Sequence, residues 1–336
     1  MKKIIRRIII LLLLFLLLFI WLSLVYFKET KNPPYQYPGN DSYTIKPSDN
    51  EDNETENKTM ALSSLYPIIF VHGWMGKNID YLEYLAKLQS KGVAESKGLI
   101  DRYSNESICP EKWPVGVAVS AEYYYFDNFN RGIEDYAKEL DHSVGLVMNC
   151  TGSEQVVLVA HSMGGLVSRK YMVDYGNEHV KKLITLATPH YGFNEFTRTE
   201  IVLMIIRLFT GREKEVDQMR PDSDFLKQLD KDDLNQRDNI VSIGTYNVAN
   251  QTASFGLTVF QSELSGFEKQ HFENSDVVVK LDSTKLAGAK YYQIEGCSHT
   301  ELLGFRKSYP KGPISNPKTC PDAYNIVQKE IVISHP

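Results

Sequence analysis

The sequence has few cysteines, and they stand far apart. Only four of the 336 residues are cysteine, and none belongs to a Cys-x-x-Cys pair; they are Cys109, Cys150, Cys297 and Cys320. This spacing excludes the usual zinc-binding patterns. In an oxidising compartment the same residues can form one or two disulfides, whose pairing the sequence leaves open.

An excess of positive charge is also missing. Four Lys and Arg precede an apolar run near the N-terminus, which leaves 33 for the remainder of the chain against 42 Asp and Glu, a formal net charge of about −9. A surface of this sign repels phosphate backbones, so nucleic acid is excluded as a partner. No internal repeat is apparent, and a composition with 43% hydrophobic and 24% charged residues is typical of a globular protein.

One long apolar segment stands at the front of the chain. Residues 8–27 are uncharged and almost wholly apolar, and a run of about 20 such residues is enough to cross a bilayer as a helix. A cleaved secretory signal is the alternative, but its apolar core is usually shorter and ends at a small-x-small site. The basic residues before the run are Lys2, Lys3, Arg6 and Arg7. We expect residues 1–27 to form a cytoplasmic basic end and a transmembrane anchor, in a single-pass membrane protein whose remainder faces outward.

Residues 28–64 are polar, contain several prolines and show no apolar periodicity, which is typical of a flexible linker. Residues 65–336 alternate short apolar runs with longer amphipathic stretches. This alternation predicts an α/β fold, with a mostly parallel central sheet and helices on both faces. Buried strands are predicted at residues 68–71, 122–126, 155–159, 183–187, 240–243 and 291–294, and helical spacing marks residues 132–147 and 164–175.

A serine stands between a β-rich run and a helix. Ser162 lies in the segment Ala-His-Ser-Met-Gly-Gly, residues 160–165, a Gly-x-Ser-x-Gly pattern with alanine in the first place. A strand before and a helix after are the context that a nucleophilic serine requires. The alternative is a serine that caps an ordinary helix after a core strand. We predict that Ser162 is the nucleophile of an acyl-transfer reaction.

A glycine-containing loop follows the first predicted strand. In His-Gly-Trp-Met-Gly, residues 72–76, glycine allows the backbone to approach the serine. We predict that the backbone amides of Trp74 and Met163 stabilise the oxyanion of the substrate. For His72 we expect a structural role, holding this loop by hydrogen bonds.

The general base has to come from elsewhere in the chain. Of the eight histidines, His299 is the best candidate because it lies just past the last predicted strand, at the sheet edge where open α/β folds bind ligands. His190 also follows a strand and is the rival, whereas His161 is too close to the serine in sequence. The orienting acid is expected between nucleophile and base, after a strand. Asp276 meets this condition best, and Asp282 is the alternative.

At these motifs the chain resembles the α/β-hydrolase superfamily, and within it the bacterial lipases and esterases that carry Ala-His-Ser-Met-Gly-Gly. The resemblance covers roughly residues 65–305. It implies an α/β-hydrolase fold, a triad in the order Ser, Asp, His, and two oxyanion amides. These roles fall on Ser162, Asp276, His299, Trp74 and Met163. The predicted anchor and the bulk of Trp74 depart from the family pattern.

Residues 191–238 are a possible lid, because residues 201–209 within them are nearly all apolar. A buried core helix explains the same run. Together these features predict a hydrolase of carboxylic esters, acting on lipid or acyl esters with no metal or organic cofactor and reaching the membrane through its N-terminal helix. An acyltransferase or thioesterase on the same triad, and a non-catalytic membrane-tethered binding module, are the alternatives.

Overall fold

The computed structural model describes residues 66–74, 76–123, 131–193, 213–246, 275–276, 278–299, 301–303 and 320–333. The predicted anchor, residues 1–27, and the predicted linker, residues 28–64, lie outside these ranges. Within the described ranges, no helix has the length and apolar character needed to cross a membrane.

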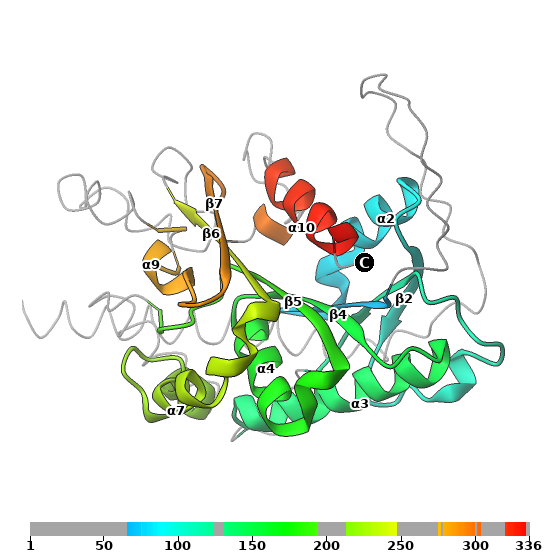
Figure 1. The fold of residues 1–336 in the computed structure, drawn as a ribbon, viewed down its shortest axis with the longest axis horizontal. Helices are drawn as coiled ribbons and strands as arrows, with labels where there is room; N and C mark the ends of the chain where they lie inside the picture. Colours follow the sequence, from blue (N-terminus) through cyan, green and yellow to red (C-terminus); the bar gives the residue numbers. More distant parts are fainter. Residues whose placement is uncertain are drawn as a thin grey trace, which may run out of the picture. The chain divides into compact units, whose positions relative to one another are not determined.

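A sheet of seven parallel strands forms the centre of the described residues, in the order β2-β3-β1-β4-β5-β6-β7 (Figure 1). Each predicted strand except the second overlaps an observed one. The strands are β1 Ile68–Val71, β2 Glu95–Ile100, β3 Val117–Ala121, β4 Val156–His161, β5 Val180–Leu186, β6 Ile240–Tyr246 and β7 Lys290–Glu295. The predicted α/β fold with a parallel central sheet is therefore confirmed.

The strand predicted at residues 122–126 is wrong in position. The observed strand is β3, which ends at Ala121; Glu122 and Tyr123 follow it outside the sheet, and residues 124–126 lie outside the described residues. The aromatic run that begins at Tyr123 has the stronger β propensity. The true strand consists of small residues, Val-Ala-Val-Ser-Ala, whose signal is complete burial rather than alternation.

Strand β2 was not predicted at all. It lies at the edge of the sheet, and most of its residues remain partly exposed, so its sequence, Glu-Ser-Lys-Gly-Leu-Ile, carries little apolar signal. The pairing with β3 shifts register between Ser96 and Gly98, and Gly98 has a φ of 82°. This irregularity interrupts the period of two that identifies a strand.

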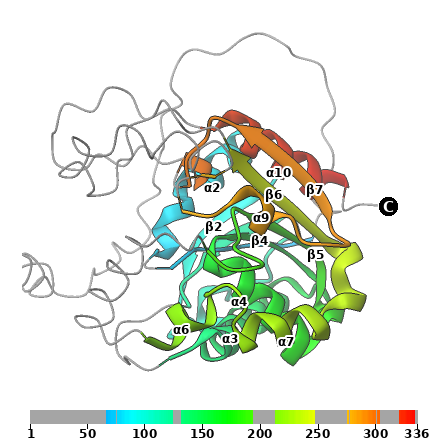
Figure 2. The same ribbon diagram turned by 90° about the vertical axis from the view of Figure 1, so that its left-hand side faces the viewer.

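Two layers of helices cover the sheet (Figures 1 and 2). Helices α3, α4 and α7 contribute apolar side chains to one buried cluster, and α2 and α10 to the other. Strand β1 shows the division, since Ile69 and Val71 belong to the first cluster whereas Ile68 and Phe70 belong to the second. Burial on both faces explains why the strands are continuous apolar runs.

The longest described helix follows its predicted spacing closely. Helix α3 begins after Gly132, whose backbone N–H donates to the Asp135 carboxylate at 2.7 Å, and it ends at Gly152, which has a φ of 73°. Helix α4 continues into a π-helical turn, Met172–Gly176. The α-helices are α2 Leu82–Ser90, α3 Ile133–Thr151, α4 Met163–Tyr171, α6 Glu213–Gln218, α7 Asp224–Asp232, α9 Leu281–Thr284 and α10 Pro321–Ile333. Short 3-10 turns occupy Asn78–Tyr81, Glu106–Ile108, Asn177–His179, Leu234–Asn239 and Glu301–Leu303.

A buried carboxylate fastens helix α10 to the sheet. Glu330, which is 1% exposed, accepts hydrogen bonds from Lys182 of β5 at 3.1 Å and from Lys290 and Tyr292 of β7 at 2.6 and 2.7 Å. Burial opposes ionisation of Glu330, but the hydrogen bonds from Lys290, Tyr292 and Lys182 outweigh it and hold the pKa of this carboxyl below its ordinary value.

Glu330→Gln tests this attachment. Because the pKa is lowered in the folded state, the carboxylate stabilises the fold at neutral pH, and this contribution is lost as the pH falls below the ordinary value of 4.5. We expect the free energy of unfolding at neutral pH to fall by about 1–3 kcal/mol in urea titrations. The difference in unfolding free energy between the wild type and Glu330→Gln should become smaller in acid. Glu83→Gln, which removes a partly exposed pair with Lys87, is the control, with an expected loss under about 0.5 kcal/mol. A difference in unfolding free energy that stays constant in acid would contradict a stabilising role of the ionised Glu330 carboxylate.

All four cysteines are paired, Cys109 with Cys150 and Cys297 with Cys320. The second disulfide joins the segment after β7 to the start of α10. Replacing both Cys297 and Cys320 by serine should lower the free energy of unfolding by about 3 kcal/mol. The reason is that the disulfide closes a loop between residues 23 apart in the sequence, and without it the unfolded chain gains conformational entropy. Urea unfolding without reductant measures this loss. A double variant as stable as the oxidised wild type would refute it.

Candidate active site

Ser162 occupies a sharp turn between β4 and α4. It has φ 53° and ψ −127°, a conformation that residues with a side chain rarely adopt and that costs roughly 1–3 kcal/mol. The turn is held on both sides, since the Ser162 N–H donates to the Leu186 carbonyl at 2.8 Å and the Ser162 carbonyl accepts from Gly165 N–H and from the Thr188 hydroxyl at 3.0 and 2.9 Å. The serine is 8% exposed and lies at the carboxyl edge of the sheet.

Two glycines after Ser162 are required by close packing. A Cβ atom at Gly164 would collide with the backbone carbonyls of Val71 and His72, and one at Gly165 would collide with the Thr188 side chain. The first turn of α4 therefore rests directly against the end of β1. This contact explains the Met-Gly-Gly sequence that follows the serine.

The structure brings Asp276 and His299 together. The Nδ1 atom of His299 lies 2.6 Å from Oδ2 of Asp276, and the His299 N–H donates to the Asp276 carbonyl at 3.2 Å. The other carboxylate oxygen accepts from the N–H groups of Val278 and Val279 at 2.9 and 2.7 Å. Asp276 is fully buried and His299 is 9% exposed. Asp282, the alternative acid, is exposed in α9.

These contacts determine the tautomer of His299. A carboxylate only accepts, so Nδ1 carries the proton and donates it, which leaves the Nε2 lone pair available to take a proton. The ring of His299 lies beside the Ser162 turn, 4.5 Å between centroids from the ring of His161. Among the described residues no hydrogen bond joins the Ser162 hydroxyl to His299. Such contacts are often long before substrate binds.

The loop after β1 lies against the same turn. A Cβ atom on Gly73 would be 3.0 Å from Cβ of Ser162, so only glycine allows this approach. Among the described backbone hydrogen bonds, none uses the N–H of Trp74 or of Met163, and Met163 is the first residue of α4, where such groups have no partner within the helix. Both amides are therefore available to an anion.

His72 holds this loop, as the sequence predicted. Its Nε2 lies 2.8 Å from the carboxylate of Glu122, and its ring stacks on Tyr123 with 4.4 Å between centroids. The Tyr123 hydroxyl donates to the His72 carbonyl at 2.5 Å. The second carboxylate oxygen of Glu122 accepts from the N–H of Asn78, so the loop is fastened at both ends.

Glu215 of α6 is a buried carboxylate that the sequence gave no reason to select. One oxygen accepts from the indole N–H of Trp74 at 3.0 Å, and the other accepts from the Tyr136 hydroxyl of α3 at 3.0 Å. It is fully buried. Glu215 thus connects the Trp74 loop to residues 213–238 of the predicted lid, which pack in the core through Val216, Leu226 and Leu229; residues 194–212 of that lid lie outside the described residues.

Trp74→Phe removes this indole donor and leaves the ring volume largely in place. We expect the free energy of unfolding to fall by about 1–3 kcal/mol, because a buried carboxylate loses a donor. Trp113→Phe is the matched control, since Trp113 also packs against the core and its indole donates no hydrogen bond within the described ranges. Equal losses in the two variants, measured by urea unfolding, would show that ring size alone matters.

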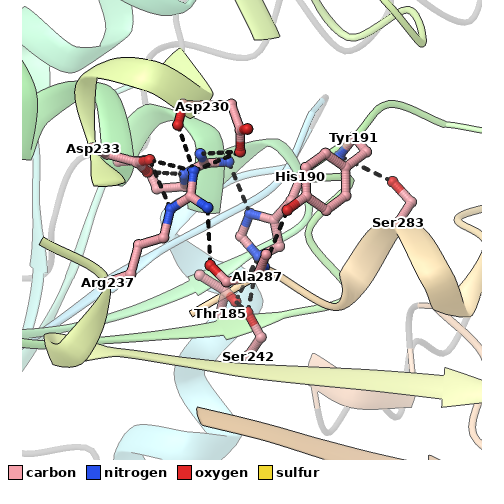
Figure 3. Close-up of polar contacts among 10 residues, drawn as sticks. Thr185, His190, Tyr191, Asp230, Asp233, Arg237, Ser242, Ser283 and Ala287 are labelled. Carbon is pink, nitrogen blue, oxygen red and sulfur yellow. Dashed lines mark hydrogen bonds and ion pairs between the residues drawn. The ribbon is translucent and has the colours of Figure 1, made fainter. Parts of the chain in front are cut away.

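A second buried polar cluster surrounds His190 (Figure 3). The guanidinium of Arg169 in α4 lies 3.2 Å from Nδ1 of His190, and Nε2 of His190 lies 3.0 Å from the Ser242 hydroxyl and 3.2 Å from the Thr185 hydroxyl. Asp233 binds Arg169 at 2.5 Å. The imidazole of His190 is fully buried.

The geometry excludes His190 as the base in this state. Arginine only donates, so Nδ1 of His190 accepts and the proton resides on Nε2, which donates to the hydroxyls. A base would need Nε2 unprotonated. Burial, and then the charges of Arg169 and Arg237, lower the pKa of His190. Among the described residues no carboxylate contacts this ring, so the hydrogen bond between Ser242 and His190 belongs to a structural network that joins α4 to β5 and β6.

Within the part of the chain that the structure describes, no group of three or more His, Cys, Asp or Glu side chains is arranged to hold a metal ion.

Comparison with known proteins gives a match to a family model over part of the chain. Residues 66–204 match the family described as "alpha/beta hydrolase fold". A curated relative, the GPI inositol-deacylase of Candida albicans, is 25% identical over an alignment of 154 residues that covers 43% of this chain. The matched part is 36% of that relative, so the chain corresponds to well under two thirds of its length.

Comparison with solved structures matches a phospholipase and a lipase. Phospholipase PlaB from Legionella pneumophila superposes with a TM-score of 0.51 and 16% identity, over 81% of this chain and 63% of that one. The mature form of the Bacillus licheniformis lipase BlEst2 gives a TM-score of 0.48 and 18% identity, over 71% of this chain and 87% of that one. At 16% identity, the similarity to phospholipase PlaB is one of fold alone.

Proposed function

Because the chain has the α/β-hydrolase fold, we propose that it is a serine hydrolase that cleaves carboxylic esters, with lipid or acyl esters as substrates. One observation carries the proposal: the strained backbone of Ser162 lies beside a histidine whose Nδ1 is bound to a buried aspartate. Strain of this kind persists where the surrounding structure imposes it and is common at active sites.

The mechanism follows from the available atoms. Nε2 of His299 takes the proton of Ser162, and the hydroxyl oxygen attacks the ester carbonyl. Asp276 holds the tautomer and stabilises the imidazolium that forms. The amides of Trp74 and Met163 bind the oxyanion, aided by the positive end of α4. His299 then protonates the departing alcohol, and water, activated in turn by His299, releases the acyl group from the serine.

The substrate class rests on two observations. The curated relative is named a deacylase, so an ester of a fatty acid is the first substrate to test. Residues 201–209 are nearly all apolar, and as a lid or wall they would suit acyl chains. An acyltransferase or thioesterase would use the same residues, with an alcohol in place of water or a thioester in place of the ester.

The sequence and the cysteines support a proposal for the location. We propose that residues 8–27 anchor the chain in a membrane and that the hydrolase domain faces outward. Pairing of all four cysteines supports an oxidising compartment, because disulfides are rare in the cytosol.

A fluorophosphonate probe, which reacts with activated serines, tests the proposal on the full-length chain in detergent. We expect the wild type to label and Ser162→Ala to lose all labelling. Asp276→Asn should lower kcat on an ester by a factor on the order of 10⁴, because the amide no longer selects the productive tautomer. His299→Ala should cause a loss of at least similar size.

His190→Gln serves as the control, because the buried polar cluster around His190 has no part in the proposed mechanism. It should keep kcat within about tenfold of the wild type wherever it folds, since it removes only hydrogen bonds that are each worth about 1 kcal/mol. A folded wild type that neither labels nor hydrolyses any ester in a panel of acyl lengths would favour the non-catalytic binding module instead.

A further inference from the structure

His161 immediately precedes Ser162, and the mechanism above assigns it no role. It is 4% exposed, and its Nε2 lies 2.8 Å from the carbonyl oxygen of His299. Because a carbonyl only accepts, Nε2 carries the proton and donates it. The two imidazole rings are 4.5 Å apart between centroids and inclined by 53°.

This contact differs from the other bonds of His299. The His299 N–H and Nδ1 both bind Asp276, so they fix the base relative to the acid and not relative to the serine. Within the described ranges, the bond from His161 is the direct hydrogen bond between the Ser162 turn and the segment that carries His299. The path from nucleophile to base therefore runs through one peptide unit, one imidazole and one hydrogen bond.

The other ring nitrogen also lies in a confined place. A Cβ atom on Gly73 would be 2.9 Å from Nδ1 of His161, so the loop that carries Trp74 packs against this ring. The side chain of His161 consequently touches three parts of the site: it belongs to the Ser162 turn, donates to the base residue, and packs against the oxyanion loop. A side chain enclosed in this way has little freedom to change rotamer.

We propose that His161 is a positioning residue, whose Nε2–H holds the His299 carbonyl and thereby sets the distance between the Ser162 hydroxyl and the base. The role rests on the proposed function. It requires that kcat fall when the donor is lost, even in a variant that still folds, since reaction rates respond to small errors in the distance between nucleophile and base.

The charge state of His161 suits this role. Burial, and then the neighbouring His299, lower the pKa of the His161 imidazole, so the ring stays neutral. During the reaction His299 gains a proton. A neutral neighbour donates to its carbonyl without adding a second positive charge beside the imidazolium.

Three substitutions of His161 distinguish the effect of the hydrogen-bond donor from that of the ring. His161→Phe keeps the ring and removes the donor. In His161→Gln the amide nitrogen reaches about as far as Nε2, whereas in His161→Asn the amide is too short to do so. The matched control is His142→Phe: His142 is exposed on α3, and its Nε2 likewise contacts a backbone carbonyl, that of Ser104, at 3.0 Å.

The measurements are kcat and KM on an ester substrate, the rate of fluorophosphonate labelling, and the melting temperature, all with the full-length chain in detergent. We expect His161→Phe and His161→Asn to lower kcat and the labelling rate by about 10- to 100-fold, with KM changed by less than about threefold. His161→Gln should stay within about fivefold of the wild type, and His142→Phe should match it. If His161→Phe does not fold, the contrast between Asn and Gln decides the matter.

Wild-type kcat in the Asn and Phe variants would overturn the positioning role, as would equal losses in Asn and Gln or a loss confined to KM. In each of these outcomes the labelled wild type still supports the hydrolase. A folded wild type that neither labels nor hydrolyses would remove the proposed function, and the role of His161 with it.

Discussion

The site depends on how closely the start of α4 approaches the end of β1. The carbonyls of Val71 and His72 occupy the space that a side chain at Gly164 would need, so the first turn of the helix fits there only because residue 164 is a glycine. For the chain to enter that helix directly from β4, Ser162 must take a left-handed backbone conformation. The serine hydroxyl, the first free amide of the helix and the loop at Gly73 are brought together by this one contact.

Buried ionic groups attach the surrounding elements to that centre. Arg169 joins α4 to Asp233, Glu215 joins α6 to the Trp74 loop, and Glu330 joins α10 to the sheet. A buried charge without partners is costly, so each of these groups favours the one arrangement in which it is paired. Such groups therefore specify the positions of helices more sharply than apolar packing alone, which tolerates small shifts.

The sequence was sufficient for the parts of the molecule where burial leaves a regular pattern of residue types. Strand β1 was predicted from its continuous apolar run, and α3 from its amphipathic stripe. Asp276 and His299 were also selected from the sequence, by order along the chain and by their positions after strands. The structure adds that they are in contact.

Other features leave no periodic trace. Strand β2 is polar because it lies at an edge, and β3 was displaced in the prediction by the aromatic residues that follow it. Glu215 looks like any charged residue of a surface helix, because its burial comes from Trp74 and Tyr136, which are distant in sequence. The disulfide pairing depends on which loops meet in space, and spacing along the chain does not reveal it.

The disulfide between Cys297 and Cys320 has a consequence for how the molecule matures. It ties the segment bearing His299 to α10, and Glu330 fastens that helix to β5 and β7. A ribosome releases the serine and its strand long before it releases α10. Nascent chains can therefore form the Ser162 turn before this disulfide can close, so the covalent attachment of the segment that bears His299 is made only after the start of α10 has been synthesised.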